Sequence, residues 1–163
     1  MATKSNLVDN GVGQEVNITR VFDAPRELVF KMWTDPELVE KWWGPKDFTN
    51  PVCTLEPWVG GGIRIVMRGP DGMPYPISGV FTKIVASELI VFHNIKEGDD
   101  GEAQLEAENS VQFLEEDGKT KMVLRAVVIR STPDACQSIG GMNMGWNQSI
   151  DRFAQNLQLL TNE

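Results

Sequence analysis

The hydrophobic pattern of this chain changes period near its carboxyl end, and that change constrains the fold more than any other feature. Between residues 142 and 160 apolar side chains recur every three or four positions, which predicts one long helix with a single apolar face. The stripe consists of Met142, Trp146, Ile150, Phe153, Leu157 and Leu160. Such a helix must cover an apolar surface, and only a sheet built from the preceding segments is large enough.

Six segments in the middle of the chain are predicted to be strands, because they are short, apolar and separated by turn residues. They span residues 48–57, 63–68, 77–85, 88–96, 105–115 and 119–130. Pro70-Asp71-Gly72 and Asp117-Gly118 provide the turn chemistry of tight hairpins, and residues 98–101 form a looser polar connection. Hairpins join antiparallel neighbours, so the six strands are expected to form a meander.

A strand and two short helices are predicted before this meander. Residues 15–23 alternate between two faces, as a strand does. Asp23 with Pro25, and then Asp35 with Pro36, each place a capping side chain and a proline where a helix begins. The order of strand, two helices, six strands and helix defines the fold class as α+β.

Length and composition indicate one globular domain. With 163 residues, of which 41% are hydrophobic and 23% charged, the chain can bury a single core. We place this domain at residues 15–163, after a disordered tail at residues 1–14. The net charge of -8 disfavours nucleic acid and anionic membranes as partners. Neither a membrane span nor a signal peptide is recognisable, so we expect a cytoplasmic protein without a membrane partner.

Few residues suggest catalytic or metal chemistry. Cys53 and Cys136 lie far apart, without the spacing of a redox pair, and are interpreted as reduced thiols. His93 is the only histidine, so the usual zinc ligand set is lacking, and we expect no metal and no cofactor. The glycines at 60–62 and 140–145 lack the lysine of a phosphate-binding loop. We interpret the first group as a bend in the sheet and the second as a loose start of the last helix.

Several strings of residues together resemble one protein family. They are ITRVFDAP at 18–25, WWGP at 42–45, GGG at 60–62, RGPDG at 68–72, SGVF at 78–81 and GWNQSID at 145–151. Taken in this order they resemble the homologues of the activator of the heat-shock protein 90 ATPase, a branch of the START-like superfamily. The resemblance implies the helix-grip fold. In this fold a curved antiparallel sheet of about seven strands and two short helices enclose a cavity, and the long C-terminal helix packs on the concave face.

The resemblance also sets the functional expectations. Similar domains bind apolar small molecules in the cavity or serve as chaperone accessory modules. We expect a non-enzymatic domain that binds a small, largely apolar molecule. The alternative is an accessory module that acts on a heat-shock protein 90 type ATPase, so a chaperone is the second partner considered, and a cyclase-like or hydrolytic enzyme is the third possibility. A homodimer is favoured if Trp42 or Trp43 is exposed.

The cavity is expected at the Trp146 end of the last helix, where the small residues Gly79 and Gly145 leave space and no bulky leucine fills it. The candidate lining residues are Met142, Trp146 and Ile150 on the helix, and Met67, Phe81, Val91, His93 and Phe113 on the sheet. For His93 two roles stay open, a group that faces the ligand or a histidine satisfied by a neighbouring strand. A β-bulge would exchange the two faces of a strand and its candidates with them.

Overall fold

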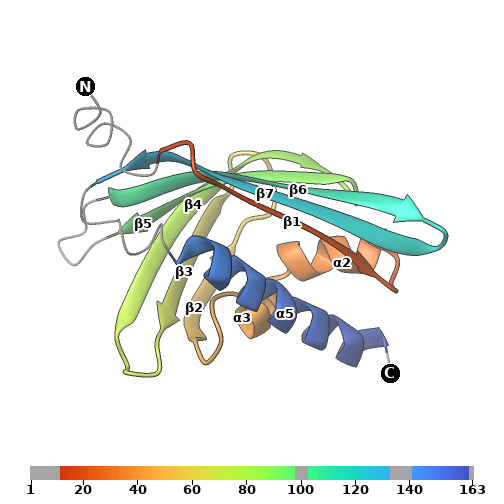
Figure 1. Cartoon of the computed structure of the whole chain (residues 1–163), viewed down its shortest axis with the longest axis horizontal. Coiled ribbons are helices and arrows are strands. Elements are labelled where there is room, and N and C mark those ends of the chain that lie inside the picture. The colour runs from red at the N-terminus through yellow and green to blue at the C-terminus, as the bar shows by residue number, and fades with distance from the viewer. Residues whose placement is uncertain (1–11, 98–102, 133–140, 162–163) are drawn as a thin grey trace.

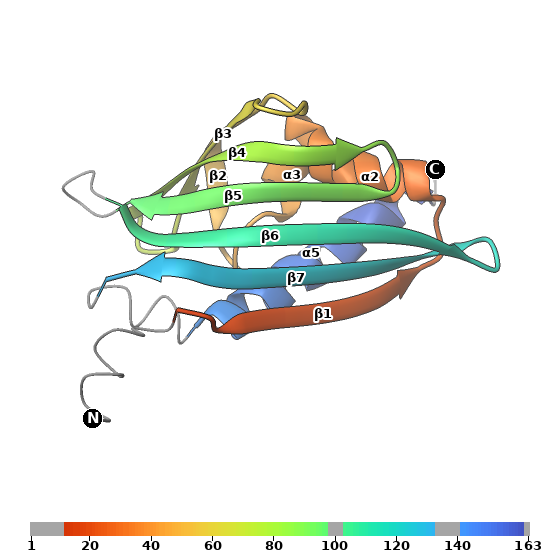
Figure 2. The same cartoon turned by 90° about the horizontal axis from the view of Figure 1, so that it is seen from above.

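A computed structural model of the chain describes residues 12–97, 103–132 and 141–161. Seven antiparallel strands form one sheet in the order β1-β7-β6-β5-β4-β3-β2 (Figures 1 and 2). The strands are β1 (Glu15–Phe22), β2 (Thr49–Leu55), β3 (Gly62–Arg68), β4 (Pro74–Val85), β5 (Leu89–Glu97), β6 (Ala103–Glu116) and β7 (Lys119–Ser131). Strands β2 to β6 each pair with the next strand in sequence, and β7 also pairs with β1. The predicted meander is confirmed.

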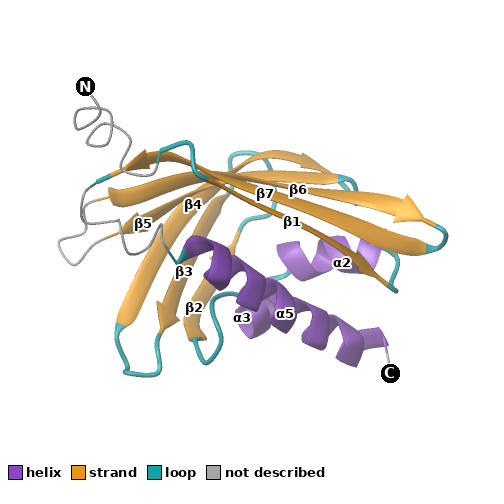
Figure 3. Cartoon of the chain, in the orientation of Figure 1, coloured by secondary structure: helices purple, strands orange, loops and turns teal. Residues whose placement is uncertain are grey.

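The three helices found among the described residues lie on the concave side of this sheet (Figure 3). They are α2 (Arg26–Thr34), α3 (Pro36–Trp42) and α5 (Met142–Thr161). The two short helices connect β1 to β2, and α5 runs beneath the arch formed by the strands (Figure 1). The α+β helix-grip fold predicted from the sequence is therefore confirmed, with the long C-terminal helix on the concave face.

The two predicted helix caps have different outcomes. Asp35 caps α3 as predicted, because its Oδ1 accepts a hydrogen bond of 3.0 Å from the Glu37 amide, and Pro36 follows it. The predicted cap at Asp23 is wrong. Pro25 itself occupies the cap position of α2, in an extended conformation and without a side-chain cap bond. Asp23 lies two residues before this cap position, too far to reach the first free amides of the helix.

The predicted hairpin turns are present. Gly72, Asp117 and Gly118 have φ angles of 85°, 52° and 81°, the left-handed conformations that tight turns require. The connection predicted at 98–101 lies outside the described residues, as do residues 1–11 of the predicted tail. The amide of Gly13 already donates to the carbonyl of Val128 at 2.8 Å, so hydrogen bonding to β7 begins before residue 15.

The core lies between the sheet and the three helices. Ile150, Phe153 and Leu157 of α5 are 0%, 0% and 3% exposed, as the helical stripe predicts. Trp42 and Trp43 are also buried, at 0% and 8% exposure. The exposed tryptophan that would favour a homodimer is therefore not found at either position.

Candidate functional site

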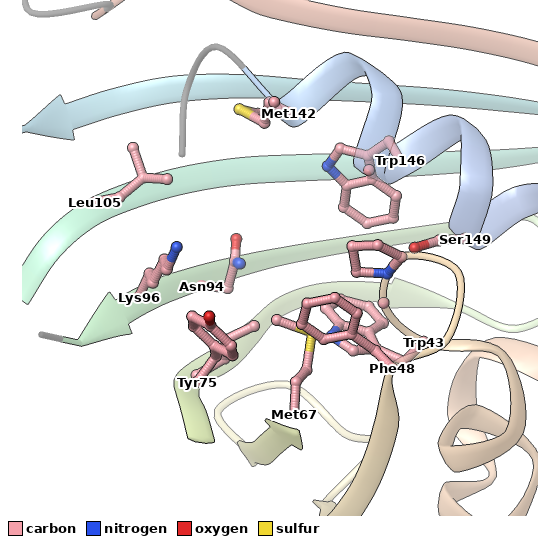
Figure 4. Close-up of a pocket in the computed structure, with 15 residues that line it drawn as sticks. Trp43, Phe48, Met67, Tyr75, Asn94, Lys96, Leu105, Met142, Trp146 and Ser149 are labelled. Carbon is pink, nitrogen blue, oxygen red and sulfur yellow. The ribbon is translucent and has the colours of Figure 1, made fainter. Parts of the chain in front are cut away.

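An open cavity of about 380 Å³ lies between the first turns of α5 and the ends of β3, β4, β5 and β6 (Figure 4). It is lined by Trp43, Gly44, Pro45, Phe48, Met67, Tyr75, Ile77, Asn94, Lys96, Leu105, Gly141, Met142, Gly145, Trp146 and Ser149. These residues come from the sheet, from the segment between α3 and β2, and from α5. The cavity is thus bounded by elements that are far apart in sequence.

Three of the eight candidate residues line this cavity: Met67, Met142 and Trp146. Phe81 and Phe113 on the sheet and Ile150 on α5 also lie between the sheet and the helices, but they are only 3%, 0% and 0% exposed and belong to the solid core. They fill space that was predicted to belong to the cavity.

Val91 and His93 do not line the cavity, and their assignment to the helix side of β5 is wrong. Ile90 and Phe92 are the buried residues of this strand, at 0% and 3% exposure, and Phe92 contacts the Trp33 ring of α2. Alternation along the strand therefore turns Val91 and His93 to the opposite side of the sheet. The sequence could not decide between these faces, because both halves of the alternation contain apolar residues.

On that opposite side His93 has a carboxylate neighbour from the next strand. Its Nε2 lies 3.4 Å from Oε2 of Glu106, and Oε1 of Glu106 accepts a hydrogen bond of 3.0 Å from Arg130. His93 therefore does not face the cavity, but its Nε2 is buried without a hydrogen-bond partner among the described residues, so the alternative of a histidine satisfied by a neighbouring strand is not met either.

Two glycines have roles other than the predicted ones. Gly79 does not widen the cavity, because a Cβ at this position would lie 2.3 Å from the carbonyl oxygen of His93. Its small size allows β4 and β5 to approach each other. Gly145 does line the cavity, but it is part of α5, and its amide donates to the carbonyl of Gly141 at 2.8 Å. The last helix therefore begins at Met142, as the apolar stripe predicts, and Gly145 is not part of a loose start.

Aromatic rings form one end of the cavity. Trp146 of α5 meets Trp43 edge to face, with ring centroids 5.5 Å apart. Trp43 follows the last residue of α3 in an extended conformation, and Gly44 then turns the chain at φ 95°. A Cβ on Gly44 would lie 3.0 Å from the sulfur of Met67, so only glycine fits this corner without strain. WWGP is therefore a local signature of the aromatic end.

The Arg152 side chain of α5 anchors the segment that contains WWGP. Its guanidinium donates to the carbonyl oxygens of Trp43, Gly44 and Pro45 at 3.0, 2.9 and 3.0 Å, and to that of Lys41 at 3.1 Å. Burial lowers the pKa of Arg152 from its ordinary value. No local sequence pattern indicates this role of Arg152, because the carbonyls it binds lie more than a hundred positions away.

The other end of the cavity is polar. Figure 4 shows Asn94 and Lys96 of β5 near Tyr75 of β4, away from the tryptophans. The Lys96 amino nitrogen lies 5.6 Å from the centre of the Tyr75 ring, within the range of a cation–π contact. Burial lowers the pKa of Lys96 from its ordinary value. Sequence reasoning missed both β5 residues because it chose the wrong face of the strand.

The described residues offer little else for metal or thiol chemistry. Among the residues that the structure describes, no group of three or more histidine, cysteine, aspartate or glutamate side chains could hold a metal ion. Cys53 is a half-buried free thiol, and Cys136 lies outside the described residues. None of the described helices is both long enough and apolar enough to cross a membrane.

A curved seven-stranded sheet closed by a long helix over an open cavity defines a helix-grip domain. A family model described as activator of Hsp90 ATPase homolog 1-like protein matches residues 23–158. The chain belongs to this family, as the resemblance of its sequence strings implied.

Solved structures show the same fold. A solution structure of a protein from Arthrobacter aurescens has a TM-score of 0.78 and 25% identity, covering 90% of this chain and 87% of that one. The AHSA1 protein from Silicibacter pomeroyi has a TM-score of 0.74 and 22% identity, covering 89% and 98%. A protein from Nitrosomonas europaea has a TM-score of 0.73 and 21% identity, covering 91% and 97%. No curated protein matches the sequence.

Proposed function

We propose that this domain binds a small, largely apolar molecule in the cavity at the start of α5, without converting it chemically. The observation that carries the proposal is the aromatic end of the cavity, where Trp43, Phe48 and Trp146 surround the open space. A volume of about 380 Å³ falls within the range of roughly 300 to 1,000 Å³ that is usual for small-molecule sites. Apolar walls with a few polar groups are also typical of such sites.

The shape of α5 supports the same proposal. Its second half is packed solidly, because the Phe153 ring packs against those of Phe22 and Trp42 at centroid distances of 5.2 and 5.0 Å. Its first turn instead carries Gly145 and Trp146 at the edge of the cavity. One helix thus stabilises the fold at one end and presents a contact surface at the other.

The test compares two truncations on this helix. Trp146→Ala removes a wall of the cavity, whereas Leu157→Ala removes a core side chain that does not line it. The neutral probe N-phenylnaphthylamine, followed by its own emission, should bind the wild type saturably. We expect Trp146→Ala to weaken this binding about tenfold more than Leu157→Ala does, which corresponds to roughly 1.4 kcal/mol.

Both variants lose stability, because large core truncations cost about 2 to 5 kcal/mol. Binding must therefore be measured at a temperature where thermal melts show both to be folded. Equal losses of affinity would move the site away from Trp146. If the folded wild type bound no apolar probe saturably, the proposal would fail.

A chaperone accessory module is the second candidate, and the family match favours it. The turn between β2 and β3 offers an apolar contact surface, since Trp58 and Val59 are 58% and 63% exposed. Such a role would place the protein in the cytoplasm with its chaperone. Stimulation of a heat-shock protein 90 type ATPase by the purified chain, lost in Trp58→Ser, would support this candidate over the first.

A further inference from the structure

The two ends of the cavity differ in chemistry, and this difference bears on what the cavity binds. The aromatic end presents the rings of Trp43, Phe48 and Trp146, while Lys96 reaches into the opposite end (Figure 4). A ligand that spans the cavity therefore meets an apolar surface at one end and an ammonium group at the other.

The backbone positions Lys96 firmly in the cavity wall. In the sheet it stands opposite Ile77 of β4 on one side and opposite Leu105 of β6 on the other. Both neighbours also line the cavity, so the aliphatic stem of Lys96 lies between apolar side chains. Its amino group lies near the Tyr75 ring.

The charge in the cavity is opposite in sign to that of the protein. Of the fifteen described residues that line the cavity, Lys96 alone is charged, whereas the whole chain has a net charge of -8. A positive group inside an otherwise acidic molecule attracts an anion to that point and opposes a cation. Burial disfavours the charged form of Lys96, and an anion nearby favours that form.

Building on the proposed function, we infer that the ligand is an amphipathic carboxylate, with its carboxylate at Lys96 and its apolar body against Trp43, Phe48 and Trp146. A bond between an ammonium and a carboxylate is charge-assisted and is stronger than a neutral hydrogen bond. A lysine is a point charge with rotatable donors, which suits a single carboxylate group. Asn94 and Tyr75 lie beside Lys96 and supply further polar atoms at this end.

The test uses two matched pairs of acid and amide, because the carboxylate could belong to an aromatic acid or to a fatty acid. Naphthylacetate is compared with naphthylacetamide, and decanoate with decanamide, by titration calorimetry at neutral pH. In each pair the apolar body is constant and only the charge changes. We expect the wild type to bind at least one acid about tenfold or more tightly than its amide. The pair with the larger ratio identifies the kind of body.

Three variants locate the charge that is responsible. Lys96→Met keeps the length of the stem and should reduce the acid-to-amide ratio to about one, while Lys96→Arg should preserve a preference for the acid. Lys83→Met is the matched control, because Lys83 is an exposed lysine on β4 that does not line the cavity. The control should keep the wild-type ratio. If Lys96→Met does not fold, Lys96→Gln takes its place, and the wild-type comparison needs no variant.

The outcomes separate this inference from the proposed function. Equal binding of acid and amide by the wild type, with saturable binding of the neutral probe, would overturn the carboxylate and leave the apolar site in place. An acid preference that survives in folded Lys96→Met or Lys96→Gln would overturn the role of Lys96. Failure of the wild type to bind the acids, the amides and the neutral probe would overturn both proposals.

Discussion

At the scale of single residues, Cys53 shows how burial changes reactivity. This thiol lies in β2, and burial together with the neighbouring charge of Glu40 raises its pKa from an ordinary 9.0 to about 11. The thiolate is the reactive form of cysteine. Cys53 is therefore expected to behave as a structural side chain at neutral pH.

We predict slow alkylation of Cys53 by iodoacetamide. A rise in pKa from 9.0 to about 11 lowers the thiolate fraction at neutral pH by about 100-fold. The more basic thiolate is a better nucleophile and recovers about tenfold, so the folded protein should react about tenfold more slowly than the unfolded chain. Mass spectrometry of the Cys136→Ala variant, folded and in denaturant, measures both rates on this one thiol. Equal rates would contradict the raised pKa.

At the scale of elements, the contact between α5 and the segment after α3 holds the aromatic end of the cavity together. One guanidinium, that of Arg152, satisfies four carbonyl groups there. A second arginine contacts the same helix in a simpler way. Arg20 of β1 donates to Asp151 at 2.7 Å in an ion pair whose side chains are 31% and 61% exposed. The two arginines thus differ in burial and in the number of partners.

We predict that Arg152→Met lowers the free energy of unfolding by about 2 to 4 kcal/mol, because it leaves several carbonyl groups without their charged donor. The same change should weaken binding of the neutral probe, since Trp43 and Gly44 lose their anchor. Arg20→Met is the matched control and should cost less than about 1 kcal/mol, as exposed ion pairs contribute little. Urea denaturation measures both. Similar losses would show that the carbonyl contacts do not stabilise the fold.

The elements that the sequence predicts best are those whose signals are local. The φ angles at Asp117-Gly118, the cap at Asp35 and the stripe of α5 depend on neighbouring residues, and all agree with the structure. The facing of β5 was not predictable, because Val91 and Phe92 are both apolar and only packing against the helices selects the buried one. The contacts of Arg152 depend on residues more than a hundred positions away, so no local pattern contains them.

At the scale of the whole molecule, α5 completes the core on the concave side of the sheet, which α2 and α3 cover only in part (Figure 3). Ile150, Phe153 and Leu157 are at most 3% exposed and contribute the helix side of that core. Sheets with one uncovered apolar face are not stable alone. The helix that lines the cavity is therefore also required for folding.

We predict that a chain ending at Gly141 does not unfold cooperatively, because it lacks the apolar stripe of α5. Circular dichroism during heating should show a broad, gradual change for the truncated chain and a single sharp transition for the full chain. The variant Leu159→Ala is a useful control, because Leu159 is 66% exposed and should leave the transition nearly unchanged. A sharp transition in the truncated chain would contradict the role assigned to α5.

The tryptophans described above also give the molecule a distinctive optical property. Trp42 lies 4.7 Å from Trp33, Trp33 lies 6.2 Å from Trp146, and Trp146 lies 5.5 Å from Trp43, measured between ring centroids. At such separations, excitation absorbed by one indole migrates to the others before light is emitted. Trp146 borders the cavity, so a molecule that quenches this one ring dims all four. The intrinsic emission of these four rings is thus expected to report on occupancy of the cavity without any added label.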